Sequence, residues 1–393
     1  MEVLYLFNPE NDMALACGDP YYMAPAGVRR MAAELSALPA WYAEAGGAVL
    51  VDSRRRAMMA EEPFPVPLAV EWVTEVSSIY NKVCPWGWNP SLVHRLQGVG
   101  MPAGAYPLAG QMEDIRRLSG RHTAVGVLRR LRCALPAFTV GEAFVLPSVG
   151  EVEEFVLSHA QALLKAPWSG SGRGIQHASG VFPAPLRGWV EHILTTQGAV
   201  VGEPFYERVL DFAMEFFSDA ADGGIRFIGY SLFETDKRGS YKENVLAADA
   251  EIEARLAGYV SREALHLLRD ELLAELKDVI KGDYEGYLGV DMMICRNAGQ
   301  GAGGYSLHPC VEINLRMNMG VVARLFYDRY VCGEAQGRYV IEYYRTPGEA
   351  AQVHCRLRQQ YPLLVVEGKI KSGYLSLTPV AEDTAYQAYI ILE

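Results

Sequence analysis

The stretch from Leu163 to Ile175 constrains the fold most, because an apolar run ends there in Lys165 and glycines follow at positions 170, 172 and 174. Glycine tolerates unusual backbone angles, so such a loop can fold over a phosphate chain with its N–H groups aimed at one anion. Lys165 would add a point charge for the same phosphates. An ordinary flexible turn is an equally good interpretation of these residues alone. The Walker pattern is excluded because the lysine precedes the glycines, and no clear helix follows Gly174 to form a dinucleotide-binding turn.

Composition narrows the class of protein. The chain has 393 residues, of which 50% are hydrophobic and 21% charged, so we expect two or three packed domains. A formal charge of −11 argues against nucleic acid or an anionic membrane as a partner. The seven scattered cysteines form no Cys-x-x-Cys pair, and no secretory leader or run of eighteen apolar residues occurs. We therefore expect a soluble cytoplasmic protein, for which a homodimer is compatible with the size.

The first 110 residues favour a parallel α/β layer, because short apolar stretches alternate with a helical pattern. The strands expected are Val3–Phe7, Ala48–Val51 and Val70–Val73, with a helix over Ala26–Leu38. Ligands sit at the carboxyl ends of strands in such sheets. The residues at these ends are Asn8, Glu10, Asn11, Asp12 and Asp52, for which turn formation and helix capping are equally compatible roles.

Two further units follow along the chain. The second has expected strands near Ala137–Val140, Ala162–Lys165 and Ala199–Val201, and helices over Val149–Ala162 and Trp189–Leu194. In the third, Leu210–Phe217 alternates so that Asp211 and Glu215 share one face. The remaining elements expected are a strand at Ile225–Phe233, a helix at Ser261–Ile280 that stops at Gly282, strands at Gly289–Ile294 and Cys310–Asn314 around a glycine-rich hairpin, and strands near Tyr339–Tyr344, Leu363–Glu367 and Gly373–Leu377.

Two of these expected strands carry a set of oxygen-bearing side chains. Asp291 lies in Gly-Val-Asp-Met-Met-Ile, and Glu312 and Asn314 lie in Val-Glu-Ile-Asn-Leu-Arg. Residues i and i+2 face the same way, so Glu312 and Asn314 point together, and Asp291 can join them if the strands pair. Two carboxylates and an amide suit Mg²⁺, whereas zinc favours His or Cys. Solvent-facing carboxylates are the alternative, weakened by the apolar flanks. Arg316 continues the alternation and can neutralise a phosphoryl group or hold a carboxylate.

Taken in chain order, these motifs resemble one family. They are a lysine before a serine- and glycine-containing loop, a strand ending in Glu203-Pro-Phe205, the strand carboxylate Asp211, Gly-x-Asp at Asp291, and Glu-Ile-Asn-x-Arg ending at Arg316. The ordered set, over roughly residues 110 to 330, resembles the ATP-grasp superfamily, which includes D-alanine–D-alanine ligase and biotin carboxylase. The resemblance implies an α/β protein (α+β in the ATP-binding part) with the ATP-grasp fold and an N-terminal parallel α/β domain. The implied domains are 1–110, a small subdomain 111–205 with the glycine loop, and a large subdomain 206–393 with the metal site.

The resemblance also implies roles for individual residues. Lys165 and Arg121 would contact the phosphates of ATP, although many members carry lysine in place of Arg121. Ser169, Ser171, Gly172 and Gly174 would belong to the loop that covers the phosphates. Lys242 would add a phosphate contact from a mobile loop, with a solvated lysine an equally good interpretation.

The other implied roles concern the base, the ribose and the metal. Glu203 and Phe205 would form the hinge that reads the adenine amino group, and Asp211 would hold the ribose hydroxyls. Asp291, Glu312 and Asn314 would bind Mg²⁺, or Mn²⁺ in its place. Arg316 would act with Lys165 at the transferred phosphoryl group.

The implied chemistry is activation of a carboxylate. ATP phosphorylates the carboxylate to an acylphosphate, and an amine or similar nucleophile then displaces phosphate. The substrates would be a small-molecule carboxylate and an amine. A small-molecule kinase that uses the same nucleotide site and a non-catalytic nucleotide-binding protein of this fold remain alternatives, whereas a redox enzyme is disfavoured by the context of the loop.

Overall fold

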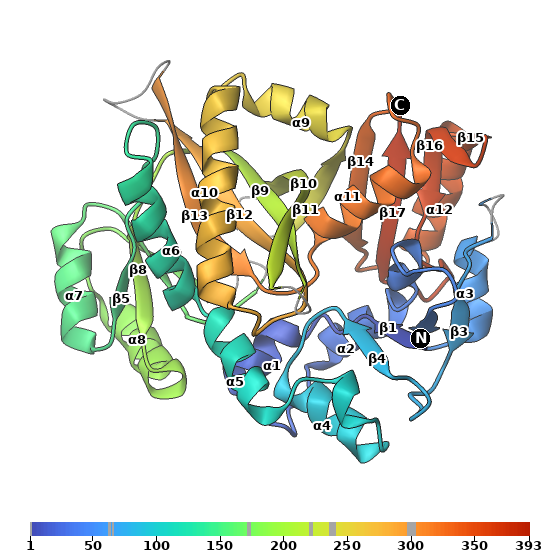
Figure 1. Cartoon of the computed structure of the whole chain (residues 1–393), viewed down its shortest axis with the longest axis horizontal. Helices are drawn as coiled ribbons and strands as arrows, with labels where there is room; N and C mark the ends of the chain where they lie inside the picture. The colour runs from blue at the N-terminus through green and yellow to red at the C-terminus, as the bar shows by residue number, and fades with distance from the viewer. Residues whose placement is uncertain are drawn as a thin grey trace.

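The computed structural model describes residues 2–61, 64, 67–170, 174–219, 223–235, 241–296 and 304–393. Its strands form three sheets, which Figure 1 shows as an N-terminal sheet, a small sheet beside α7 and α8, and a large sheet that extends to the C-terminus. No helix in the described part of the chain is long and apolar enough to span a bilayer.

The N-terminal sheet is parallel, as the alternation of strands and helices predicted. Its strand order is β3-β2-β1-β4. The elements of this unit are β1 (Val3–Leu6), α1 (Asn11–Cys17), α2 (Ala26–Glu34), a 3₁₀ turn (Leu38–Trp41), β2 (Ala48–Leu50), α3 (Arg54–Glu61), β3 (Glu71–Val73), β4 (Lys82–Pro85), α4 (Pro90–Gly98) and a second 3₁₀ turn (Ala103–Ala105).

The small sheet is antiparallel, with the order β5-β8-β6-β7. The elements of this part of the chain are α5 (Ala109–Leu118), α6 (Arg121–Ala134), β5 (Phe144–Leu146), α7 (Val149–Ser158), β6 (Ala162–Lys165), β7 (Ile175–Ala178), α8 (Ala184–Gln197) and β8 (Val200–Pro204). The glycine loop is therefore the turn of the β6–β7 hairpin, which the bond from the Ala166 N–H to the Gly174 carbonyl closes at 2.8 Å.

The large sheet is antiparallel and has the order β13-β12-β9-β10-β11-β14-β17-β16-β15. Its elements are β9 (Arg208–Asp219), β10 (Gly224–Thr235), β11 (Tyr241–Leu246), α9 (Asp249–Leu256), α10 (Arg262–Ile280), β12 (Gly286–Arg296), β13 (Tyr305–Asn314), α11 (Met319–Tyr330), β14 (Gly337–Tyr343), α12 (Glu349–Gln360), β15 (Leu364–Val366), β16 (Lys369–Ser376) and β17 (Tyr386–Leu392). Ser261 caps α10 by accepting the N–H of Ala264, as expected for a helix beginning there.

The small sheet has a hydrophobic core separate from those in the rest of the chain. Leu4 of β1, Leu128 of α6, Phe212 of β9 and Leu268 of α10 belong to one continuous cluster. The small sheet instead has a core of its own around Leu164. Phe212, Met214 and Phe216 fill the apolar face of β9 as its alternation predicted, which leaves the opposite face for polar side chains.

Several expected elements differ in the structure. No strand forms over 137–140, where Thr139 makes a single bridge to Leu307; the edge strand of the small sheet is β5 instead. The helix expected over Ala26–Leu38 is α2, which ends at Glu34, and Leu38–Trp41 form a separate 3₁₀ turn that contains Pro39. Strands β11 and β17 were not expected. The hairpin expected at 299–304 lies almost entirely outside the described residues.

Candidate active site

The three predicted metal ligands lie together on two neighbouring strands. β12 and β13 are antiparallel, with Asp291 directly opposite Glu312. Asn314 lies two residues further along β13, and its Nδ2 donates to Oδ2 of Asp291 at 3.0 Å. Burial raises the pKa of Asp291 to about 7, and the Glu312 charge acts in the same direction. The strands thus place three oxygen-bearing side chains on one face. Burial and the neighbouring Glu312 charge disfavour the ionised form of Asp291 there.

Arg121 joins this carboxylate set to the glycine loop. It is the first residue of α6 and is 4% exposed. Its Nη2 lies 2.9 Å from both carboxylate oxygens of Glu312, while Nη1 donates to the Ala166 carbonyl at 2.6 Å and to Oγ of Ser169 at 2.7 Å. One guanidinium therefore contacts the start of the loop and one of the predicted metal ligands.

Arg316 lies on the other side of Asn314 and meets a residue of the N-terminal unit. Its Nε and Nη2 each lie 2.8 Å from a different carboxylate oxygen of Asp12, and Nη2 also donates to Oδ1 of Asn314 at 2.9 Å. Burial acts to lower the pKa of Arg316, but the hydrogen-bonded Asp12 carboxylate and the charges of Glu312 and Asp291 together outweigh it, so the pKa is raised. Of the polar residues at the ends of the parallel strands, Asp12 contacts Arg316 and Asn11 lines the same hollow, whereas Asp52 is exposed.

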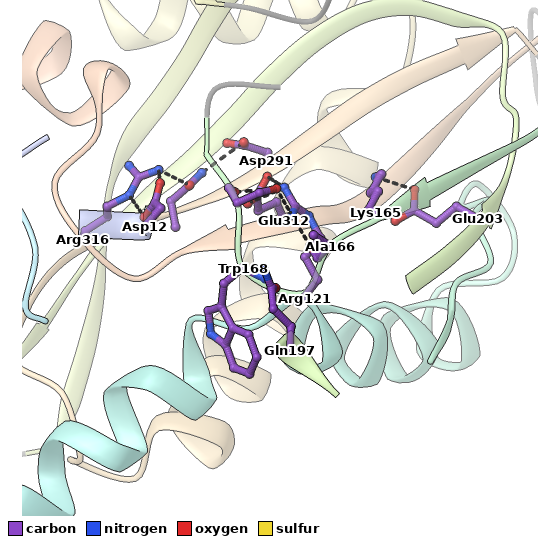
Figure 2. Close-up of polar contacts among 12 residues, drawn as sticks. Asp12, Arg121, Lys165, Ala166, Trp168, Gln197, Glu203, Asp291, Glu312 and Arg316 are labelled. Atoms are coloured by element: carbon purple, nitrogen blue, oxygen red, sulfur yellow. Dashed lines mark hydrogen bonds and ion pairs between the residues drawn. The ribbon is translucent and has the colours of Figure 1, made fainter. Parts of the chain in front are cut away.

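Lys165 and Glu203 form a buried ion pair. They lie on the neighbouring strands β6 and β8, and Nζ is 2.6 Å from Oε2, with both side chains 5% exposed. Figure 2 shows this pair and the Asp12–Arg316 pair on opposite sides of Glu312 and Arg121. The predicted phosphate lysine and the predicted hinge residue thus contact each other directly.

The remaining predicted residues lie at different distances from this centre. Asp211 on β9 faces the same side as Asp291 and contacts Arg208 at 2.7 Å. The exposed Phe205 donates its N–H to the Gln161 carbonyl at 3.1 Å. Lys242 is on β11, three strands from β12, with its ammonium 3.0 Å from Glu234. The structure thus does not bring Lys242 to the other predicted residues.

The described part of the glycine loop starts at the site. Ser169 contacts Arg121, and Gly174 has a φ of 71°, a left-handed conformation that favours glycine. A Cβ at Gly170 would lie 2.4 Å from Oδ2 of Asp12, so glycine there permits the loop to approach α1. Ser171 and Gly172 lie outside the described residues.

Glu215 is a further buried carboxyl group that was not among the predicted site residues. It lies on β9, opposite Gly289 of β12, and is 1% exposed. Burial raises its pKa to about 8, although Asn318 Nδ2 donates to its Oε2 at 2.8 Å. The shared face of Asp211 and Glu215 was the sequence signal that could have identified it.

His308 lies fully buried on β13, near the Lys165–Glu203 pair. Neither ring nitrogen has a partner among the described residues. The ring packs against Tyr206 and against Gly141, where a Cβ would lie 2.4 Å from the imidazole. Burial lowers its pKa to about 3, and the charges of Lys165 and Arg132 act in the same direction. The imidazole is therefore neutral at physiological pH.

The chemistry of the donor set fits a hard divalent cation. The carboxyl groups of Asp12, Glu215, Asp291 and Glu312 outnumber the guanidinium groups of Arg121 and Arg316 by four to two. A cation at Asp291, Glu312 and Asn314 would relieve this excess, with Arg121 giving up part of its hold on Glu312. The described residues hold no group of three or more His, Cys, Asp or Glu side chains arranged for a metal. The predicted set has two carboxylates and the amide of Asn314.

Comparisons with known proteins identify the fold. No family's sequence profile matches the chain, and no curated protein matches it in sequence. Among solved structures, the ADP complex of an N5-carboxyaminoimidazole ribonucleotide synthetase aligns at a TM-score of 0.52 and 12% identity, covering 100% of this chain and 92% of that chain. Biotin carboxylase from Campylobacter jejuni, in complex with an ATP analogue, aligns at 0.52 and 11%, covering 99% and 87%.

A third solved structure agrees. The biotin carboxylase domain dimer of Hydrogenobacter thermophilus 2-oxoglutarate carboxylase, with MgADP and bicarbonate, aligns at a TM-score of 0.53 and 11% identity, covering 100% of this chain and 85% of that chain. At these identities the likeness establishes the fold. The chain has the ATP-grasp fold, with a parallel α/β unit before it, as its motifs predicted.

Proposed function

We propose that this protein is an ATP-dependent ligase that activates a small-molecule carboxylate with Mg-ATP and joins it to an amine or a similar nucleophile. The observation that carries the proposal is the convergence of Asp291, Glu312 and Asn314 with Arg121 and Arg316 on one face of an ATP-grasp fold. Solved structures with this fold include an N5-carboxyaminoimidazole ribonucleotide synthetase with ADP and biotin carboxylases with β,γ-ATP or MgADP.

The site residues can serve phosphoryl transfer by positioning and by charge. Magnesium, held by Asp291, Glu312 and Asn314, would neutralise charge on the transferring group. Lys165 on the small sheet and Arg121 at the start of α6 would supply further positive charge. Because both already hold carboxylates, the phosphates would share these cations with Glu312 and Glu203. The two arginines would hold the donor and acceptor oxygens in line, and the loop would exclude water from the acylphosphate.

The test measures magnesium-dependent ADP release from ATP with pooled small carboxylates and amines. We expect release by the wild type and loss of about a hundredfold or more in Glu312→Gln, which keeps the size of the side chain but removes its charge. Glu285→Gln is the matched control, because Glu285 precedes β12 and forms an exposed pair with Lys82; it should retain full activity.

The outcomes separate the alternatives. ADP release that requires the amine supports a ligase, whereas release with the carboxylate alone and accumulation of a phosphorylated product would indicate a kinase. Magnesium-dependent ATP binding without turnover under any pool would favour a nucleotide-binding protein. Tight ATP binding that Glu312→Gln leaves unchanged would contradict the magnesium site.

A further inference from the structure

The carboxylate of Asp12 binds the guanidinium fork of Arg316, a position that a substrate carboxylate could also take. Two guanidinium nitrogens each meet a different oxygen of the same carboxylate at 2.8 Å, which is the bidentate geometry typical of carboxylate recognition. The partners lie 304 positions apart in the chain, one on α1 and the other just after β13. The pair is 15% and 24% exposed, so a small molecule can reach it.

On the proposed function, the same place suits the carboxylate that is phosphorylated. Arg316 also donates to Asn314, one of the proposed metal ligands, so its fork lies beside the proposed phosphoryl position. The hollow at this point is lined by Asn11, Asp12, Trp168, Ser169, Glu312 and Arg316. Its free cavity volume is about 10 Å³ while Asp12 is in place, enough for about one water molecule. A substrate can therefore enter only if Asp12 leaves the fork.

If a substrate carboxylate displaces Asp12, the Asp12 carboxylate loses its positively charged partner. With a substrate carboxylate on Arg316, two carboxylates would face one guanidinium, next to Glu312 and Asp291. Arg121 already contacts Glu312 and so offers no free fork. The lost partner is replaced if the substrate carries its own positive charge close to its carboxylate, because that charge would pair with the displaced Asp12.

We propose that Asp12 holds the place of the substrate carboxylate on Arg316, and that the substrate is a short amino acid whose carboxylate replaces Asp12 while its ammonium group pairs with it. Asp12 is then a specificity-determining residue from the N-terminal unit. The proposal rests on the ligase function proposed above and names the class of its carboxylate substrate.

The experiment compares two matched pools in the ADP-release assay. One pool contains amino acids such as glycine and alanine, and the other contains the same molecules without the amino group, such as acetate and propionate; both receive the same mixture of small amines, so that an acceptor is present in each. Wild type, Asp12→Asn and Asp12→Ala are compared, with Asp52→Asn as the matched control because Asp52 also follows a parallel strand but is exposed. Circular dichroism and thermal unfolding establish that each variant is folded.

We expect the wild type to prefer the amino-acid pool in kcat/KM, and Asp12→Asn to reduce that preference about tenfold or more, the factor expected for one charged hydrogen bond. The deaminated acids should gain in the variant because their internal competitor has lost its charge. Asp52→Asn should match the wild type. An unchanged preference in folded, active Asp12→Asn and Asp12→Ala would overturn the proposal and leave Asp12 as a structural contact.

Failure of this proposal is distinguishable from failure of the ligase function. ADP release that depends on the deaminated pool and not on the amino-acid pool would retain the ligase and overturn the role of Asp12. Absence of release with either pool, together with MgADP binding that Glu312→Gln does not weaken, would overturn both.

Discussion

The two ends of the site bury ionisable groups in opposite ways. At the end formed with the small sheet, Lys165 is neutralised by Glu203, and burial lowers the pKa of His308 to about 3. At the end formed with the N-terminal unit, burial raises the pKa of Asp291 to about 7 and that of Glu215 to about 8. At the first end, the buried lysine is paired with a carboxylate. At the second end, the buried carboxyl groups favour their protonated form.

This difference indicates where a cation is needed. A buried carboxyl group with a raised pKa loses its proton more easily when positive charge arrives, so the end with Asp291 and Glu215 gains most from a divalent ion. The end with His308 gains nothing from one. These electrostatics favour the end with Asp291 and Glu215 for the proposed magnesium site, and they are independent of the motif resemblance.

The largest effect should come from breaking the buried ion pair of Lys165 and Glu203. In Lys165→Met, Glu203 is left as an unpaired buried carboxylate, and we expect the free energy of unfolding to fall by about 3–5 kcal/mol. The double variant Lys165→Met with Glu203→Gln removes both charges and should recover most of that loss. Urea unfolding of the two single variants and the double variant measures the coupling. Additive losses would show that the two side chains do not stabilise each other.

The second effect is a loss of stability at rising pH, caused by Glu215. Its pKa is about 8 in the folded protein against 4.5 ordinarily, so between these values the unfolded chain binds fewer protons. Stability therefore declines as pH rises through this window, by up to about 1.4 kcal/mol per pH unit from this group. Glu215→Gln can still accept the Asn318 hydrogen bond and should flatten the decline.

Urea unfolding without metal, at a series of pH values from about 5 to 8, tests this. Some slope should remain in Glu215→Gln, because Asp291 titrates in the same direction. Parallel curves for wild type and variant would mean that Glu215 is ionised throughout, and the asymmetry between the two ends would be lost.

His308 should show the opposite dependence on pH. Its folded pKa of about 3 lies below the ordinary 6.5, so the unfolded chain binds the extra proton as pH falls below 6.5. Stability should then decrease toward acid, with the same limiting slope of about 1.4 kcal/mol per pH unit over a narrower practical window. His308→Phe fills the space and removes two nitrogens that lack partners among the described residues. We expect it to flatten the acid limb and to change stability little at pH 7.5, as measured by thermal unfolding; an unchanged acid limb would contradict a neutral buried imidazole.

The parts of this picture that the sequence predicted are local ones. The apolar stretches around Asp291 and Glu312 predicted two strands, with Asp291 joining Glu312 and Asn314 if the strands paired, and they do pair. The ends of the long helix α10 followed from its cap and its leucine spacing. β17 was missed because its buried run has no alternation to detect.

The parts that the sequence could not supply depend on packing between distant segments. Asp12 was one of several turn residues, and only the docking of α1 against the end of β13 places it on Arg316. The contact between Lys165 and Glu203 follows from the order of strands in the small sheet, which no local pattern encodes. The resemblance assigned Lys242 a phosphate contact from its residue type, whereas strand order places it beside Glu234; its assigned role stays a prediction.

The smallest effects should come from ion pairs that join the N-terminal unit to the large sheet. Asp12→Asn leaves Arg316 its contacts with Asn314 and the Met317 carbonyl, and the site is partly open to water. We expect a loss of about 1 kcal/mol in the free energy of unfolding. The exposed Lys82–Glu285 pair makes a similar connection, and Lys82→Gln should cost less, about 0–1 kcal/mol, most of it absent in high salt. Urea unfolding at low and high salt compares the two. A loss in Asp12→Asn as large as that in Lys165→Met would mean that Asp12 is locked in place, and a residue so fixed could not give way to a substrate.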